Sequence, residues 1–378
     1  MKTSKAGLPS FMFSAAKTIV VKIGSAILVD EKTQSLREDW LAALAADLAV
    51  LKDKRIVLVS SGAIALGRQR LKLFETSLSL PEKQACAAAG QSSLTRAYDD
   101  ALGQHDLMTA QALLTLNDTE NRRRWLNARS TLDTLLGLGA VPIINENDTV
   151  ATDEIRYGDN DRLAARTAQM IGADLLILLS DIDGLYTADP RADTSAKHIP
   201  IITDLTEDIM EMGGAPNAAA GVGTGGMVTK LAAAKIATQA GCDMVICDGR
   251  SVGALSALGA GAKHSLFKAK SNPRKARAQW IGGTLKPSGA LHIDAGALNA
   301  LQNGSSLLPA GVTAISGTFE KGDAVSIMAN GSEVARGLIA YDLLEADRIK
   351  GLKSTEILAT LGYENGAAMI HRDNLVML

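Results

Sequence analysis

Short, nearly continuous apolar segments alternate with longer stretches of helical periodicity, and this alternation constrains the fold more than any other feature. The apolar segments span residues 18–24, 55–62, 107–114, 140–147, 175–181 and 243–249. The helical stretches span residues 37–54, 82–105, 120–137, 159–172 and 227–240. Strands that are apolar on both faces and separated by helices predict a mainly parallel sheet with helices on both sides.

The pattern changes after residue 262. Residues 263–277 hold six basic side chains and no acidic one, which indicates a linker or a surface segment. Short strand-like runs broken by glycine then continue to the end of the 378-residue chain, and they predict a small β-rich module. We therefore expect four parts, an N-terminal extension, an α/β domain, a linker and a β-rich domain with its tail, over residues 1–16, 17–262, 263–284 and 285–378.

Charge and composition argue against several classes of protein. With 39 basic and 41 acidic side chains, the net charge does not point to nucleic acid or to a membrane surface. No stretch approaches the roughly 20 apolar residues of a membrane span, and the N-terminus lacks the apolar run of a signal peptide. Cys86, Cys242 and Cys247 are odd in number and lack C-x-x-C spacing, so neither a disulfide framework nor a zinc site is predicted. We expect a cytoplasmic protein with no membrane partner.

Polar residues follow four of the predicted strands at their carboxyl ends. They occupy positions 22–25, 60–62, 145–148 and 180–181. Because ligands bind at the carboxyl ends of strands in open parallel sheets, these four ends predict one shared crevice.

The glycine-rich segment 221–230 half-matches two nucleotide-binding signatures. Gly221, Gly223 and Gly226 satisfy the dinucleotide fingerprint G-x-G-x-x-G, but a helix-like stretch precedes them where that fingerprint needs a strand. Thr229 stands where a P-loop requires glycine. An NAD-dependent dehydrogenase and a plain connecting loop remain alternatives for these residues.

A loop that leads into a helix is the better interpretation of this segment. The helical pattern begins at Met227, and the free N–H groups and positive dipole end of a helix N-terminus bind phosphate. Lys230 would lie one turn into the helix, within reach of a phosphoryl group. Lys22 ends an apolar strand, so it either reaches solvent or provides a second cation on the same phosphoryl group. Because Lys230 is at a loop–helix junction rather than in the core, we expect its replacement to leave the protein folded.

The segment 145–161 is dense in carboxylates and amides. It carries Arg156 against six acidic residues, so it is either a solvated acidic loop or a site for a small zwitterion. In the second case carboxylates would bind the ammonium group of the substrate, and amides would bind its carboxylate. Asp161, in the first turn of a predicted helix, could hold both lysines through charge-assisted hydrogen bonds.

Several segments resemble the amino acid kinase family. They include VVKIGSAIL, VSSGAIALGR, KQACAAAGQS, LNARSTL, VPIINENDTVATDEI, LLSDIDGLYTADPR and GTGGMVTKLAAAKIA, in this order between residues 17 and 262. Within the family they are most similar to enzymes that use ATP to phosphorylate the γ-carboxylate of glutamate, the first step of proline biosynthesis. The tail, with NGSSLLPAGV at residues 303–312, resembles a PUA domain. The resemblance implies the three-layer α/β sandwich of the family and a small β-rich PUA-like domain.

The resemblance also implies roles for individual residues. Lys22 and Lys230 match lysines that stabilise the transition state, and Asp161 matches the aspartate that orients them. The positions that match substrate-binding residues, with Asn145 as their neighbour, are Ser61, Asn145, Asp148 and Asn160. Those that match nucleotide-binding residues are Lys22, Ser180, Asp181, Thr224, Gly225, Gly226, Met227, Val228, Thr229 and Lys230. No protein metal ligand is implied, because Mg²⁺ would bridge ATP oxygens and keep most of its waters.

The expected chemistry agrees with the absence of histidine from these segments. A side-chain carboxylate with a pKa of about 4.3 is ionised at neutral pH, so it can attack the γ-phosphorus of ATP without a general base. From the resemblance alone we also expect feedback inhibition by proline and a homo-oligomer, either a dimer or a tetramer.

Two alternative functions remain open. The first is a kinase of the same fold that acts on aspartate, acetylglutamate, carbamate or uridylate, although the acidic segment 145–161 favours a substrate with an ammonium group. The second is RNA binding by the tail. Residues 285–378 carry 7 basic and 10 acidic side chains, which argues against it, while the basic run 263–277 keeps it open.

Overall fold

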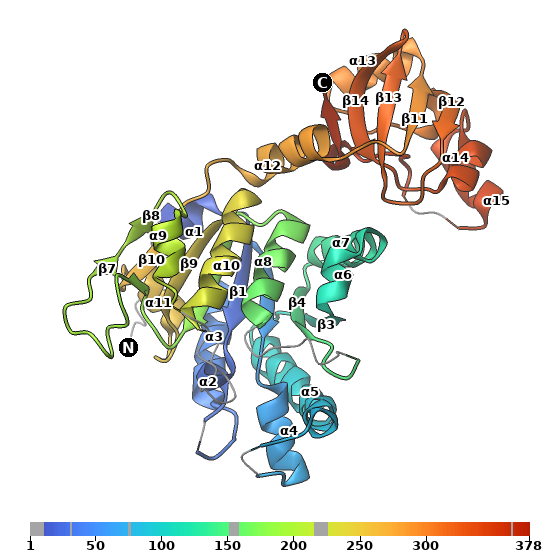
Figure 1. The fold of residues 1–378 in the computed structure, drawn as a ribbon. Helices are drawn as coiled ribbons and strands as arrows, with labels where there is room; N and C mark the ends of the chain where they lie inside the picture. The colour runs from blue at the N-terminus through green and yellow to red at the C-terminus, as the bar shows by residue number, and fades with distance from the viewer. Residues whose placement is uncertain (1–10, 31, 75–76, 151–158, 215–225, 364–365) are drawn as a thin grey trace, which may run out of the picture. The chain divides into compact units, whose positions relative to one another are not determined.

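The computed structural model describes residues 11–30, 32–74, 77–150, 159–214, 226–363 and 366–378. The chain divides into two compact units (Figure 1). The first comprises Met1–Glu120 and Asn127–Pro273, and the second comprises Asn121–Leu126 and Arg274–Leu378. Among the described residues, no helix has both the length and the apolar character that crossing a membrane requires.

The first unit is built on an eight-stranded sheet in the order β3-β4-β2-β1-β5-β9-β10-β8. Six of its strands correspond to the predicted apolar segments, and they are β1 (Thr18–Ile23), β2 (Arg55–Ser60), β3 (Thr109–Leu114), β4 (Val141–Glu146), β5 (Leu175–Ser180) and β9 (Asp243–Asp248). All six run parallel to their neighbours among them. A separate antiparallel pair joins β6 (Leu185–Tyr186) to β7 (His198–Ile199). The prediction of a mainly parallel sheet is confirmed.

The sheet extends into the segment that we expected to be a linker. His264–Phe267 form β10, which pairs antiparallel with β9 and parallel with β8 (Ile201–Ile202). The basic residues on either side of this strand indicated a surface segment, but Ser265 and Phe267 alternate into the interior and are fully buried. The α/β unit therefore continues beyond residue 262.

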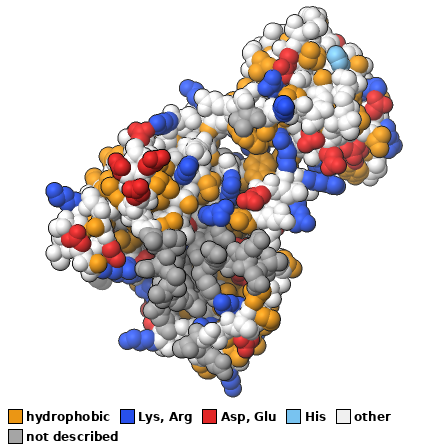
Figure 2. All heavy atoms as spheres, viewed as in Figure 1, with side chains coloured by type: hydrophobic (Ala, Val, Ile, Leu, Met, Phe, Trp, Pro, Cys, Tyr) orange, Lys and Arg blue, Asp and Glu red, His pale blue; other side chains and the backbone are white. Residues whose placement is uncertain are grey.

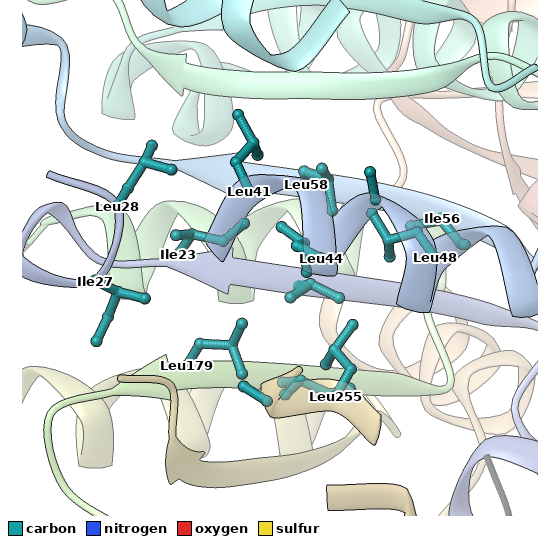
Figure 3. Packing of buried hydrophobic residues seen from close by; sticks show 14 of the residues in the cluster. Ile23, Ile27, Leu28, Leu41, Leu44, Leu48, Ile56, Leu58, Leu179 and Leu255 are labelled. Atoms are coloured by element: carbon teal, nitrogen blue, oxygen red, sulfur yellow. The ribbon is translucent and has the colours of Figure 1, made fainter. Parts of the chain in front are cut away.

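Helices cover both faces of the sheet, as predicted. The helices of the first unit are α1 (Phe11–Ala15), α2 (Ser25–Leu28), α3 (Glu38–Val50), α4 (Ala63–Leu71), α5 (Leu80–Gly103), α6 (Leu116–Glu120), most of α7 (Arg122–Gly137), α8 (Asp159–Ile171), α9 (Glu207–Glu211), α10 (Met227–Gln239) and α11 (Ala254–Gly259). Helix α12 (Pro273–Gln279) belongs, after Pro273, to the second unit. The core on one face packs α3, α5 and α11 against alternate residues of the strands. Figure 3 shows Leu44 and Leu48 of α3 in one cluster with Ile23 of β1 and with Ile56 and Leu58 of β2, and Leu48 lies beside Ile56. On the other face, α8 packs against β1, β5 and α10.

The second unit contains a five-stranded sheet in the order β12-β11-β13-β14-β15. The strands are β11 (Gly289–Ile293), β12 (Val312–Gly317), β13 (Ala324–Ala329), β14 (Ser332–Leu338) and β15 (Leu375–Met377), and α13 (Ala295–Gln302), α14 (Leu343–Ile349) and α15 (Ile357–Leu361) accompany them. A separate core that includes Leu291, Ile327 and Tyr341 holds this unit together. Acidic and basic side chains are interspersed on the face that Figure 2 shows. The prediction of a small β-rich domain is confirmed.

Helices α4 and α5 approach each other at two glycines. A Cβ atom added to Gly67 would lie 1.7 Å from the carbonyl oxygen of Cys86, and one added to Gly90 would lie 1.8 Å from that of Ala63. Both neighbouring atoms belong to the backbone of the facing helix, so no side-chain rotation can relieve the overlap. The pair of helices can pack at this distance only because both positions lack a side chain.

Gly90→Ala should therefore destabilise the protein by at least about 2 kcal/mol, because overfilled contacts force whole elements apart. Gly103→Ala is the matched control at the end of the same helix, where an added Cβ meets nothing within 4 Å. It should be neutral or stabilising by a few tenths of a kcal/mol. Urea unfolding of both variants measures the difference, and equal stabilities would contradict the proposed backbone contact.

Candidate active site

The strand order brings the predicted site residues to one edge of the sheet. Lys22 lies near the end of β1, which pairs with β2 on one side and with β5 on the other. Ser61 follows β2, Asn145 belongs to the next strand β4, and Ser180 ends β5. The residues predicted to bind the substrate and those predicted to bind the nucleotide therefore lie on opposite sides of Lys22 along the sheet.

A single buried carboxylate holds both predicted catalytic lysines. Lys22 Nζ lies 2.7 Å from Asp161 Oδ1, and Lys230 Nζ lies 3.4 Å from Asp161 Oδ2. The Thr229 hydroxyl also donates a hydrogen bond to Asp161 Oδ2, at 2.9 Å. The side chain of Asp161 is fully buried, and those of Lys22 and Lys230 are only 11% and 7% exposed. Lys22 and Asp161 thus form an ion pair although they are 139 positions apart in the sequence.

Local structure explains why these three side chains meet. Side chains alternate between the faces of a strand, so Lys22 lies on the face opposite Ile23, which packs in the α3 core. That face is covered by α8, and α8 packs against α10. Asp161 is the third residue of α8, and Lys230 is the fourth residue of α10. The first turns of the two helices therefore deliver a carboxylate and an ammonium group to the end of β1.

The environment of Asp161 keeps its carboxyl group ionised. Complete burial by itself raises the pKa of this group, but the charges of Lys22 and Lys230, with the hydrogen bonds from Lys22 and Thr229, outweigh burial and lower the pKa to about 2. The carboxylate therefore stays negative throughout the physiological pH range. It can hold both ammonium groups in fixed positions without taking up a proton.

Lys230 differs from the expectation in one respect. We expected a junction position outside the core, but the side chain is buried against Asp161. The first turn of α10 lies against α8, so this end of the helix is interior. Truncating Lys230 to alanine would leave a cavity in addition to removing the charge, so a substitution that preserves volume is the better test.

Three polar side chains from different elements form a second cluster. Asn160 Nδ2 donates hydrogen bonds to the Ser61 hydroxyl at 2.6 Å and to Asn145 Oδ1 at 3.1 Å. Asn160 directly precedes Asp161 in α8. The side chains of successive helix residues point about 100° apart. Within one turn of α8, Asn160 therefore bonds to the amide cluster, while Asp161 pairs with the two lysines.

The pKa of Asp148, which lies two residues after the end of β4, shifts in the opposite direction to that of Asp161. Loss of solvent raises the pKa of this carboxyl group to about 6. A bound cation would stabilise the ionised form and lower the pKa again. Among the described residues, no cation offsets the effect of burial on this carboxyl group, as expected of a group that binds an ammonium ion.

The residues predicted to bind the nucleotide lie on the β5 side. Ser180 donates a hydrogen bond to Asp181 Oδ1 at 3.1 Å, and Arg191 forms an ion pair with Asp181 Oδ2 at 2.7 Å. Partial burial raises the pKa of Asp181, but Arg191 and the charge of Lys230 together lower it below its usual value. The charge of Lys230 thus acts on Asp181 as well as on Asp161.

The predicted helix N-terminus is confirmed, because α10 begins at Met227 with Gly226 as its extended N-cap residue. Val228 and Thr229 belong to its first turn. The predicted nucleotide-binding residues Thr224 and Gly225 lie outside the described residues, as does the segment 151–158 of the acidic stretch. Within the described ranges, no group of three or more His, Cys, Asp or Glu side chains is arranged to hold a metal ion.

Sequence reasoning missed three residues that contact this site. Arg191 pairs with Asp181, Tyr98 lies 2.9 Å from the Ser60 hydroxyl, and Gln91 accepts a hydrogen bond from Asn145. Arg191 and Gln91 lie in segments that carry the family resemblance, which was the available signal. Tyr98 lies on the same helix as Gln91, α5, but beyond the segment that carries the resemblance.

The comparison with known proteins gives the class of this chain. The model of the amino acid kinase family matches residues 17–248, and that of the PUA domain matches residues 289–361. The chain belongs to the amino acid kinase family. The predicted membership and the predicted PUA domain are both confirmed.

Curated relatives that match this chain over almost its whole length are named glutamate 5-kinase. Glutamate 5-kinase of Caulobacter vibrioides is 57% identical over 368 residues, which cover 97% of each chain. Glutamate 5-kinase of Paramagnetospirillum magneticum is 55% identical over 96% of this chain and 98% of its own. Glutamate 5-kinase 1 of Mesorhizobium japonicum is 56% identical over 96% of each chain.

Proposed function

We propose that this chain is an enzyme that transfers the γ-phosphoryl group of ATP to the γ-carboxylate of L-glutamate, which forms L-glutamyl 5-phosphate and ADP in proline biosynthesis. The relatives named glutamate 5-kinase, which match almost the whole chain, support this reaction. The observation that carries the mechanism is the buried Asp161 that holds Lys22 and Lys230 next to the cluster of Ser61, Asn145 and Asn160.

The amide cluster and Asp148 would bind glutamate. The ionised Asp148 would pair with the α-ammonium group, since no cation among the described residues offsets its burial. Ser61 accepts a hydrogen bond from Asn160, so its own proton remains to be donated to the α-carboxylate. Both interactions select an amino acid rather than a simple carboxylate or a nucleotide.

The two lysines would stabilise the phosphoryl group during transfer. An oxygen of the ionised γ-carboxylate attacks the γ-phosphorus in line, and the bond from that phosphorus to the oxygen bridging to the β-phosphate breaks as ADP leaves. Lys22 and Lys230 neutralise charge on the moving group, while Asp161 fixes their positions in advance. No general base is required, because the attacking carboxylate carries no proton at neutral pH.

ATP would bind at the N-terminus of α10 and at the Ser180–Asp181 pair. Thr224 and Gly225 would also contact the nucleotide. Phosphate binding at a helix N-terminus uses its free N–H groups and its dipole. Mg²⁺ fits as an ion carried by ATP, because Asp161 and Asp181 are each already paired with cations, and it would offset charge on the β- and γ-phosphate oxygens. Lys22 and Lys230 would act on the remaining γ-phosphate oxygens.

The finer expectations about domains and partners remain part of this proposal. The α/β domain, expected over residues 17–262 and continued by β10, would carry catalysis, with 285–378 as an accessory PUA-like domain. Proline carries an ammonium and an α-carboxylate group but no γ-carboxylate, so it would occupy the glutamate site without reacting and would act as a competing inhibitor. The chain would act as a homo-oligomer in the cytoplasm, and the net acidic tail would not bind RNA.

Trapping of the acyl phosphate tests the reaction directly. With ATP, Mg²⁺ and hydroxylamine, the purified protein should form hydroxamate from glutamate and none above background from aspartate, acetylglutamate or carbamate. Hydroxamate from another acid of this panel, in place of glutamate, would transfer the proposal to that substrate. Parallel release of ADP without added amino acid would instead indicate a plain ATPase.

Replacing Lys230 by methionine should lower kcat by about 10²–10³-fold, since Lys230→Met removes one charge from the transition state. The KM for glutamate should change little, because the amide cluster is untouched. Lys235→Met on the exposed side of the same helix is the matched control, and it should keep normal activity. Steady-state kinetics measures kcat and KM of both variants, and circular dichroism checks that both are folded. A folded Lys230→Met enzyme with normal kcat would contradict the role of Lys230 in catalysis.

The raised pKa of Asp148 predicts the pH profile. Only the ionised carboxylate pairs with an ammonium group, and its pKa of about 6 in the free enzyme means that protonation competes with binding below that pH. The value of kcat/KM for glutamate should then fall by up to about tenfold per pH unit below pH 6, because this parameter reports the free enzyme. Asp148→Asn should show a low kcat/KM without this additional slope. A variant that retains the wild-type profile would contradict the role of Asp148.

A further inference from the structure

Gln91 contacts the amide cluster through Asn145. It lies on α5, and its Oε1 accepts a hydrogen bond from Asn145 Nδ2 at 2.9 Å. Its Nε2 lies 3.4 Å from the Thr95 hydroxyl one turn further along the same helix. Gln91 therefore offers its carbonyl oxygen to Asn145 and directs its amide nitrogen away from the cluster.

The hydrogen bonds of Asn145 define the orientation of its amide. Its Oδ1 accepts from the backbone N–H of Glu146 at 2.9 Å and from Asn160 Nδ2 at 3.1 Å, and its Nδ2 donates to Gln91. Asn145 is only 3% exposed, so an Nδ2 group without an acceptor would be costly. The acceptor on Gln91 thus stabilises the one orientation in which Asn145 turns its carbonyl oxygen toward Asn160.

That orientation determines what Asn160 can offer to a ligand. The N–H bonds of its Nδ2 are directed at Ser61 Oγ and Asn145 Oδ1, and the Ser60 carbonyl oxygen is a more distant acceptor at 3.4 Å. The polar atom of Asn160 that remains for a substrate is its carbonyl oxygen, an acceptor that suits an ammonium group. If Asn145 turned its amide over, two donors would face each other and Asn160 would have to turn as well.

Helix α5 is well placed to fix this chain of amides. Tyr98 lies two turns after Gln91 on the same face, is fully buried, and has its hydroxyl 2.9 Å from Ser60 Oγ. Gly90, adjacent to Gln91, is the position at which α5 meets the backbone of α4. The helix thus supports the ends of β4 and β2 through Gln91 and Tyr98, from a position set by backbone contact.

We propose that Gln91 is a positioning residue for the glutamate site: its carbonyl oxygen orients Asn145, and through Asn145 it orients Asn160 so that Asn160 presents an acceptor to the ammonium group of the substrate. This rests on the proposed function, since the substrate contacts of Asn160 belong to it. Gln91 touches neither the lysines nor the nucleotide residues through any contact that the described structure records, so its effect should be confined to glutamate.

Three variants test the role of the acceptor. Gln91→Met removes it at similar volume and should raise the KM for glutamate about tenfold, with kcat within about threefold and the KM for ATP unchanged. Gln91→Glu keeps acceptor oxygens at the same reach and should recover most of that loss. Thr95→Val removes the other partner of Gln91 while leaving its acceptor, and it should behave as wild type.

Three kinetic outcomes would overturn the proposal. One is a Gln91→Met enzyme whose KM for glutamate stays within twofold of wild type. The other is a Gln91→Glu enzyme as impaired as Gln91→Met, since the acceptor would then not be the important feature. A parallel loss of kcat and of both KM values would indicate only a structural role and would also overturn it.

A spectroscopic measurement separates this proposal from the reaction itself. In full-length protein labelled with ¹⁵N-asparagine, the side-chain amide signals of Asn145 and Asn160, assigned from single substitutions, should both shift in Gln91→Met and remain in place in Thr95→Val. If the wild type failed to phosphorylate glutamate, the proposed function would fall while these signals still decided the role of Gln91. Unshifted signals would reject the positioning role whatever the activity.

Discussion

The contact on which the site depends is the ion pairing of one buried carboxylate with two ammonium groups. Burial of a charge is expensive unless partners compensate it, and Asp161 meets this condition with Lys22, Lys230 and the Thr229 hydroxyl. These partners come from β1 and from the first turn of α10, while Asp161 starts α8. The carboxylate therefore ties a strand and two helices together at the point where chemistry is proposed to occur.

Among the described residues, the ion pairs of this cluster set the Asp161 carboxylate between two ammonium groups, in an environment that is almost closed to water. Electrostatic interactions are stronger there than in water, so an incoming phosphoryl group would interact strongly with both ammonium groups. Because Asp161 holds the lysines in place before the anion arrives, little reorganisation is needed when the charge moves during transfer.

Sequence patterns predicted the sheet because its six parallel strands are short apolar runs between helical stretches, a signal that depends only on local residues. They did not predict β10, whose flanking lysines masked two buried positions, Ser265 and Phe267. The meeting of Lys22, Asp161 and Lys230 could be expected from strand ends and family resemblance. The burial of Lys230 and the contact between Gln91 and Asn145 could not, because they depend on how separate helices pack.

In the proposed mechanism, the adjacency of Asn160 and Asp161 would couple recognition to catalysis. One residue bonds to the amide cluster and the next to the lysines, and both belong to the first turn of α8. A rotation or shift of that turn would displace the proposed acceptor for the substrate and the proposed cations for the phosphoryl group together. Alignment of the two reacting groups would then depend on a single helical turn.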